Sequence, residues 1–232
     1  MSFSKDVVRI IAEYSAEYKL RNWVDIKKLS WHGLSENSNA IELLKANIDK
    51  INWDLLSLNR GAIDLIKIYL HRVNWSHLSA NPAAMDLLLA NPDKIDWKWL
   101  SLNSSAIDLL KSHPDIINWS LLSANSAAID LLKANQDKIN WPNLSRNPAA
   151  IELLKANPDK IDWEELSFNT AAIDLLLANQ DKIDWVVLSA NPAAIDLLID
   201  HKGRIIWNYI SANPAIFKRA VDYQMVKILL EV

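Results

Sequence analysis

Eight acidic side chains recur at intervals of 22 residues along the chain. Two neighbouring carboxylates at a suitable separation could act as the acid–base pair of a glycoside hydrolase. An active site is built once, however, and lysines follow five of these acids at a spacing of three residues, which pairs charges on a solvated helix face. We therefore interpret the acids as surface residues: Glu42, Asp64, Asp86, Asp108, Asp130, Glu152, Asp174 and Asp196.

The histidines, cysteines and glycines offer little for metal, covalent or phosphate chemistry. His71 and His77 are close in the chain, but zinc needs three or four converging ligands and no third is predictable beside them. The absence of cysteine excludes thiolate catalysis and cysteine-based zinc sites. The three glycines are too scattered to form a phosphate-binding loop. The sequence therefore predicts a protein that is not an enzyme, with no catalytic residues, no metal ligands and no cofactor.

Basic residues recur with the same period and could follow a nucleic-acid backbone, with one phosphate contact per unit. An aspartate stands directly before most of them, which largely cancels the local field, and the formal net charge of the chain is −3. Nucleic-acid binding is therefore kept only as an alternative. The basic residues are Lys50, Arg72, Lys94, Lys138, Lys160, Lys182 and Arg204.

Nine tryptophans, each 22 residues from the next, set the period of the sequence. When each is counted as position 1 of a unit, position 5 is always serine, position 7 is always asparagine, and position 4 is leucine in all units but the last. Such a period is typical of a solenoid, in which each unit buries its apolar surface against its neighbours. The nine are Trp31, Trp53, Trp75, Trp97, Trp119, Trp141, Trp163, Trp185 and Trp207.

Each unit is predicted to contain one short and one longer helix. The residue before each Trp can cap the short helix, on which positions 1 and 4 share a face. Asn at position 7 is expected to cap the longer helix, of roughly ten residues, whose buried side is formed by positions 10, 11, 13 and 14. Asn at position 17 suits a left-handed helix terminus. Each indole N–H is expected to bond to a neighbouring group.

The predicted fold class is all-α: an α-solenoid of about nine 22-residue helix-pair repeats, with capping helices over residues 4–20 and 214–230. Layers spaced about 8–10 Å apart predict an elongated rod or superhelix roughly 80–90 Å long. We expect a single domain over residues 1–232. It comprises an N-terminal cap and degenerate unit (1–30), eight repeats (31–206), and a partial repeat with a C-terminal cap (207–232).

The run Trp-x-x-Leu-Ser-x-Asn-Pro-x-Ala-Ile-x-Leu-Leu occurs at residues 141–154 and 185–198, and at 75–88 with Met85 in place of Ile. It resembles the short Trp/Leu repeats of hypothetical proteins in large DNA viruses of algae and amoebae, and the ending 213–225 resembles the close of such arrays. The resemblance covers about residues 23–225. It implies an all-helical array with an interaction role and no catalytic residues to transfer. The regularity equally suits an engineered array.

Partner binding is expected at the positions that do not repeat, which are positions 2, 3 and 6 of each unit. Several of them carry apolar residues, which are uncommon in clusters on a surface that binds no partner. Trp99 has the side chain most typical of an interface anchor. Residues 59–74 depart furthest from the pattern, with Arg60, Tyr69 and His71, and mark either a bend of the solenoid or a ligand contact. The candidate partner-binding residues are Leu55, Leu58, Trp99, Leu102, Leu121, Phe168, Val187 and Tyr209.

We therefore predict a non-enzymatic protein–protein interaction scaffold that uses an extended repeat surface. The alternatives are a nucleic-acid-binding solenoid that uses the basic residues, or an engineered array with no natural ligand. No run of 18 apolar residues is present to span a membrane, and no signal peptide is apparent, so an intracellular, cytoplasmic location is the default expectation. An imperfectly capped end would permit oligomerisation.

Overall fold

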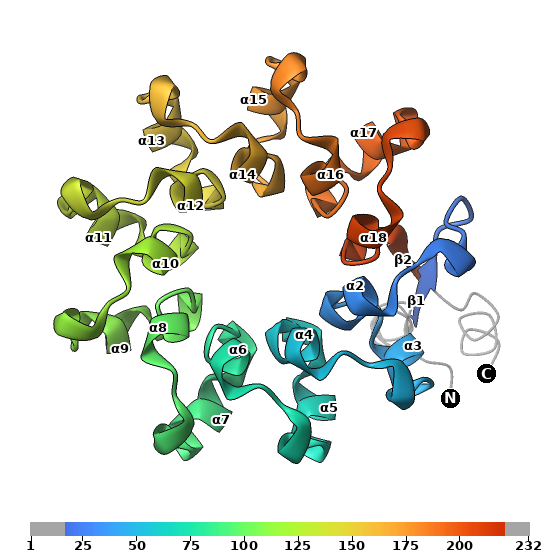
Figure 1. The fold of residues 1–232 in the computed structure, drawn as a ribbon, viewed down its shortest axis with the longest axis horizontal. Coiled ribbons are helices and arrows are strands. Elements are labelled where there is room, and N and C mark those ends of the chain that lie inside the picture. The colour runs from blue at the N-terminus through green and yellow to red at the C-terminus, as the bar shows by residue number, and fades with distance from the viewer. Residues whose placement is uncertain (1–16, 221–232) are drawn as a thin grey trace, which may run out of the picture.

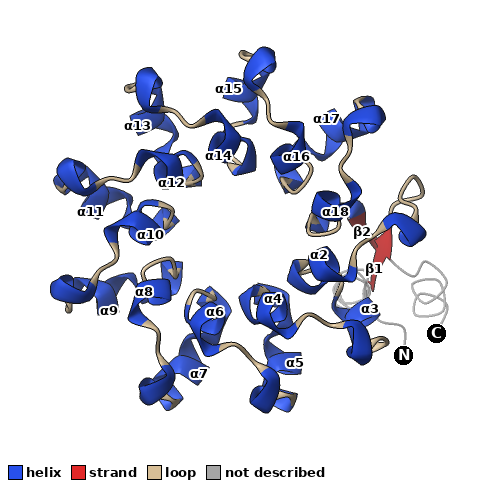
Figure 2. Ribbon diagram, viewed as in Figure 1, coloured by secondary structure: helices blue, strands red, loops and turns tan. Residues whose placement is uncertain are grey.

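The computed structural model describes residues 17–220, and over this range the chain is an α-solenoid that closes into a ring (Figure 1). The predicted all-α repeat architecture is confirmed. The helices form two concentric layers, with the tryptophan-bearing helices inside and the remaining helices outside (Figure 2). Nine units complete the circle, which corresponds to an average turn of about 40° per unit.

The inner layer consists of nine short helices, each of which begins at a period-setting tryptophan. They are α2 (Trp31–Glu36), α4 (Trp53–Leu58), α6 (Trp75–Ser79), α8 (Trp97–Leu100), α10 (Trp119–Ser123), α12 (Trp141–Ser145), α14 (Trp163–Phe168), α16 (Trp185–Leu188) and α18 (Trp207–Ile210).

The outer layer contains one α-helix from each of the first eight units. These helices are α3 (Ile41–Lys45), α5 (Ile63–Ile68), α7 (Met85–Ala90), α9 (Ile107–Lys111), α11 (Ile129–Ala134), α13 (Ile151–Lys155), α15 (Ile173–Leu177) and α17 (Ile195–Asp200).

Short 3₁₀ helices flank most of the outer α-helices. Those before the outer helix, or at its place in the last unit, are Arg60–Ala62, Pro82–Ala84, Ser104–Ala106, Ser126–Ala128, Pro148–Ala150, Pro192–Ala194 and Pro214–Ile216. Those that lead into the next inner helix are Ile26–Lys28, Ile48–Lys50, Leu70–Arg72, Pro92–Lys94, Pro114–Ile116, Gln136–Lys138, Pro158–Lys160, Gln180–Lys182 and Lys202–Arg204. The longer predicted helix is therefore a 3₁₀ turn followed by an α-helix of five or six residues.

The core lies between the two layers and repeats with the sequence. In the unit that begins at Trp119, Leu122 of the inner helix, Ala128 of the 3₁₀ turn and Leu132 of the outer helix have no exposed surface. Burial of a leucine side chain contributes about 1.5–3 kcal/mol. The acidic residues at position 12 are exposed, and three pair with the lysine three residues later, as Glu152 does with Lys155 at 3.0 Å.

The helix caps agree with the sequence-based prediction at two positions of the unit and differ from it at a third. Asn118 accepts a hydrogen bond from the Leu121 amide at 3.0 Å, as expected for the residue before Trp. Asn125, at position 7, accepts one from the Ala127 amide at 3.0 Å. The left-handed terminus predicted at position 17 is wrong, because no non-glycine residue in the described range has positive φ. Asn91 instead donates its side-chain amide to the Leu87 carbonyl at 2.9 Å.

Two ladders of buried polar side chains join each unit to the one before it. The position-7 asparagine donates both amide hydrogens to the preceding unit, as Asn125 does to the Ser101 and Asn103 carbonyls at 3.0 Å. The position-5 serine donates to the carbonyl of its own Trp and accepts the amide that precedes the next Trp, as Ser123 does with Trp119 and Asn140. These contacts explain why serine and asparagine never vary in the repeat.

Both ladders continue from the last unit into the first, so the elongated rod expected from the sequence is wrong. Asn37 donates to the Ser211 and Asn213 carbonyls at 3.0 Å, and the Ser211 hydroxyl accepts the Ser30 amide at 2.8 Å. Helix α2 contacts α18 directly (Figure 1). The surfaces that were expected to permit end-to-end oligomerisation therefore pack on each other.

The ninth unit is assembled from both ends of the described chain. Strand β1 (Glu17–Leu20) pairs antiparallel with β2 (Phe217–Ala220), in a register that places Leu20 opposite Phe217. The Arg21 guanidinium donates to the Ala215 carbonyl at 2.7 Å, and Lys28 lies over the Trp207 ring at 5.0 Å. These strands replace helix where capping helices were predicted. The rest of the N-terminal cap (residues 4–16) and residues 221–230 lie outside the described residues.

The basic residues at position 20 lie over the tryptophan rings rather than forming a free stripe. Six of the seven, Lys94 excepted, lie 4.4–4.8 Å from the centroid of the Trp that begins their unit. The repeat tryptophans pack against the core, as predicted. The predicted hydrogen bonds of their N–H groups are absent, because no indole N–H between residues 17 and 220 donates one. The N–H groups of Trp23, Trp53 and Trp185 are buried without a partner. The cations, rather than N–H bonds, supply the polar contacts of these rings.

Replacement of Lys160 by glutamine is expected to lower the free energy of unfolding by about 0.5–1 kcal/mol, because its ammonium group lies 4.4 Å from the Trp141 centroid. Urea unfolding measures the change. Lys94→Gln is the matched control, because Lys94 occupies the equivalent position but pairs with exposed Asp93 instead of a ring. Equal losses in the two variants would contradict a stabilising role for the cation–ring contact.

Candidate functional site: a central basin

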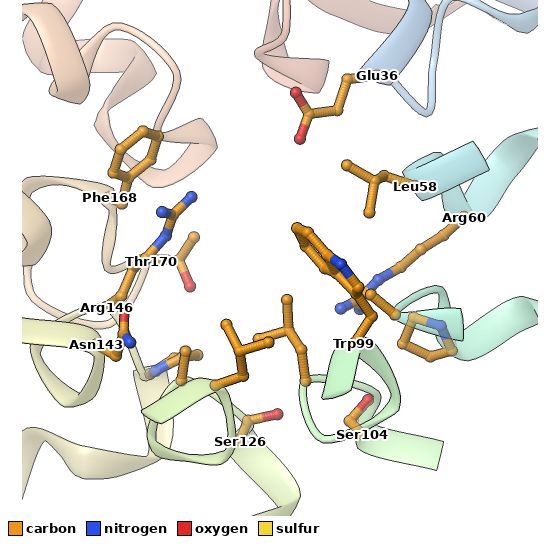
Figure 3. Close-up of a pocket in the computed structure, with 16 residues that line it drawn as sticks. Glu36, Leu58, Arg60, Trp99, Ser104, Ser126, Asn143, Arg146, Phe168 and Thr170 are labelled. Atoms are coloured by element: carbon orange, nitrogen blue, oxygen red, sulfur yellow. The ribbon is translucent and has the colours of Figure 1, made fainter. Parts of the chain in front are cut away.

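The middle of the ring is a basin with a volume of about 680 Å³, which we refer to as the central basin (Figure 3). Its lining comes from positions 3, 6 and 8 of the first seven units. The residues are Glu36, Leu58, Arg60, Ala80, Pro82, Trp99, Leu102, Ser104, Leu121, Ala124, Ser126, Asn143, Arg146, Pro148, Phe168 and Thr170.

The inner helices and the turns that follow them present these positions to the basin, because the other side of each inner helix packs against the core. Trp97 packs against the core and Leu100 is fully buried, and the two lie one turn apart on the face that meets the outer layer. Trp99 lies on the opposite side of the same helix, and Leu102 lies in the turn that follows it; both line the basin. The variable positions are therefore those whose side chains do not pack between the two layers or between neighbouring units.

The basin contains five of the eight candidate residues named from the sequence, which are Leu58, Trp99, Leu102, Leu121 and Phe168. The other three lie elsewhere. Val187 is buried, Leu55 is half-buried and Tyr209 is 42% exposed, and none of them lines the basin.

Trp99 and Phe168 stand on facing walls of the central basin (Figure 3). The Trp99 ring is half-buried and packs edge-on against His77, with centroids 5.0 Å apart. His77 is held in turn by a 2.9 Å hydrogen bond between Nδ1 and the Asp54 carbonyl. The Trp99 ring is therefore positioned by its neighbour while part of its surface faces the basin.

The charged residues of the basin were not among the sequence candidates. Arg146 occupies position 6, a position that was named as variable, so its charge could have been included with the apolar candidates. Arg60 occupies position 8, which holds proline, serine or threonine in every other unit, and its charge was the available signal. Glu36 is the third charged residue of the lining and extends from α2 (Figure 3).

The two arginines have different surroundings. The Arg146 guanidinium lies 4.0 Å from the Phe168 ring centroid, and its Nη1 is 3.4 Å from Oε2 of Glu165. Arg60 is exposed and has no ion pair or ring contact with any residue between 17 and 220. It therefore presents an uncompensated positive charge to the basin.

The structure also explains the irregular stretch at residues 59–74. Tyr69 packs on Trp53 with centroids 5.2 Å apart, and His71 packs on Tyr69 at 6.4 Å. These two residues act in packing around a tryptophan, whereas Arg60 faces the central basin. The stretch therefore combines a local variation in packing with one residue that lines the basin.

Between residues 17 and 220, no three side chains of His, Cys, Asp or Glu come together in a way that could hold a metal ion. Among the helices in that range, none has the length and apolar character needed to cross a membrane.

Comparison of the chain with protein-family models, with curated proteins and with solved structures gave no match.

Proposed function

We propose that the protein is a non-enzymatic scaffold that binds a segment of a protein partner in its central basin. The observation that carries the proposal is that five large apolar side chains face the basin from positions where the repeat does not require them. Clustered apolar side chains that face solvent are typical of interaction sites. The volume of about 680 Å³ also lies within the range of about 300–1,000 Å³ that is usual for ligand pockets.

The size of the ring favours an extended segment over a folded domain. Nine helices spaced about 8–10 Å apart around a circle place their axes about 12–15 Å from the centre. The radius of a helix with side chains, about 5–6 Å, leaves an opening roughly 15 Å across. An extended peptide has a cross-section of about 5 by 10 Å and fits this opening. It can enter along the ring axis without separation of any two units.

Replacement of Trp99 by alanine is expected to shift the melting temperature by no more than about 3 °C, because part of its ring faces the basin instead of the core. The same change is expected to weaken partner binding about tenfold or more, as removal of an aromatic anchor does. Trp119→Ala is the contrasting variant. It removes an indole that packs against the core under Lys138, and is expected to lower the melting temperature further.

The binding measurement uses the full chain, immobilised and presented with a display library of random 12-residue peptides. Enrichment of peptides whose binding is lost in Trp99→Ala supports the proposal. Absence of enrichment, or enrichment of peptides that bind wild type and Trp99→Ala equally, contradicts binding in the central basin. A large fall in melting temperature in Trp99→Ala would show instead that Trp99 belongs to the core.

A further inference from the structure

We infer that the partner segment bound in the central basin is acidic as well as apolar, with Arg60 as the main anchor for its carboxylates. This inference rests on the proposed function and specifies the chemistry of its ligand. The observations that carry it are the placement of two arginines on separate walls of the basin and the lack of an ion pair for Arg60 among the residues that the structure describes.

The placement of charges in the lining favours an anionic group beside Arg60. The charged residues of the lining are Arg60, Arg146 and Glu36, and Glu165 next to the basin offsets the charge of Arg146. No ion pair joins Glu36 to either arginine in the part of the chain that the structure describes. Among residues 17–220, Arg60 is therefore a cation without an ion pair on a wall that also carries apolar side chains, and electrostatic complementarity would direct a carboxylate of the partner segment to it.

The two arginines are expected to contribute unequally. Arg146 is stacked on Phe168 and shares its charge with Glu165, so it is held in place but partly neutralised. The Arg60 guanidinium donates to no residue between 17 and 220, so its N–H groups can bind a carboxylate in a bidentate manner. Loss of Arg60 should therefore weaken binding of an acidic segment more than loss of Arg146.

An extended peptide can reach both arginines and the apolar walls at once. Successive side chains of an extended chain point to opposite sides. Acidic residues at adjacent positions therefore face opposite walls, which is how Arg60 and Arg146 are placed (Figure 3). Apolar side chains at the following positions would contact Trp99 on one wall and Phe168 on the other.

The test uses three rhodamine-labelled peptides, acetyl-(Leu-Leu-Asp-Asp)3-amide and its counterparts with Asn or Lys in place of Asp. Fluorescence anisotropy gives the dissociation constant of each peptide for the full chain. The wild-type chain is expected to bind the Asp peptide about tenfold more tightly than the Asn peptide, the usual gain from a hydrogen-bonded charge pair. Arg60→Gln is expected to remove this preference while leaving the affinity for the Asn peptide unchanged.

Two further variants complete the comparison. Arg146→Gln should reduce the preference for the Asp peptide by a smaller factor. Lys202→Gln removes one positive charge from an exposed residue that is not part of the basin, and should leave the preference intact. An unchanged melting temperature for each variant would show that the binding changes are not caused by unfolding.

The outcomes separate this inference from the proposed function. Equal affinity for the Asp and Asn peptides, tighter binding of the Lys peptide, or an equal effect of Arg60→Gln and Lys202→Gln would overturn the acidic preference. In each of these cases, peptides selected from the random library and dependent on Trp99 would still support the proposed scaffold. Failure of that selection would overturn both.

Discussion

Replacement of Asn125 by alanine is expected to lower the free energy of unfolding by about 3 kcal/mol or more. The change removes two donors from the Ser101 and Asn103 carbonyls and one acceptor from the Ala127 amide. Asn125 is only 1% exposed, so water cannot replace these bonds without opening the contact between units. Each buried group left without a partner costs about 1–3 kcal/mol. Urea unfolding followed by circular dichroism measures the loss.

Asn143→Ala provides a matched control at the next contact between units along the chain. Its side-chain amide also donates two bonds to the preceding unit, to the carbonyl and the hydroxyl of Ser120, but these bonds are exposed to solvent. Water can replace them, so the expected loss is within about 0.5 kcal/mol. If the two variants were destabilised equally, burial of the asparagine ladder would not be the source of its contribution.

Replacement of Gly33 by valine is expected to open the ring. A Cβ at this position would lie 2.7 Å from Ser211 Cβ and 2.8 Å from the Asn208 carbonyl oxygen, closer than atoms in proteins approach. Overpacking of this kind typically costs about 1–3 kcal/mol. Here the strain falls on the one contact between units, α2 against α18, that no direct chain connection holds in place. Separation of these two helices relieves it.

Spin labels on the outside of the ring can report this opening. The chain has no cysteine, so cysteines introduced at exposed Asp49 and Asp196 can be labelled selectively. Double electron–electron resonance is expected to give one narrow distance distribution in the parent protein and a longer, broader one in Gly33→Val. Gly203→Val is the control, because a Cβ there would meet no atom within 4 Å. A distance distribution unchanged by Gly33→Val would show that the contact between α2 and α18 accommodates the added side chain.

The candidate site was partly readable from the sequence. Leu58, Trp99, Leu102, Leu121 and Phe168 were found because an apolar residue at a variable position of a repeat is not explained by packing. Val187 fits the same rule, yet it is buried, because the rule does not distinguish a position that faces the ring centre from one covered by neighbouring units. Arg60 was named as an irregularity, but its role needed the geometry of the closed ring.

The repeat unit is determined by the sequence alone. The spacing of Trp, Leu, Ser and Asn defines the start of each inner helix, the caps before Trp and at position 7, and the buried residues, because each of these features depends on contacts within a unit or with the next one. Local rules therefore suffice for the solenoid and for the solvated acids at position 12.

The closed ring was decided only by the tertiary structure. Closure depends on the sum of nine small rotations, and a change of a few degrees in each would give an open superhelix from the same local contacts. The pairing of Leu20 with Phe217 and the donation from Asn37 to Ser211 join residues that are far apart in the chain. Periodicity does not encode such pairs, and they alone bring the variable residues of seven units around one central basin.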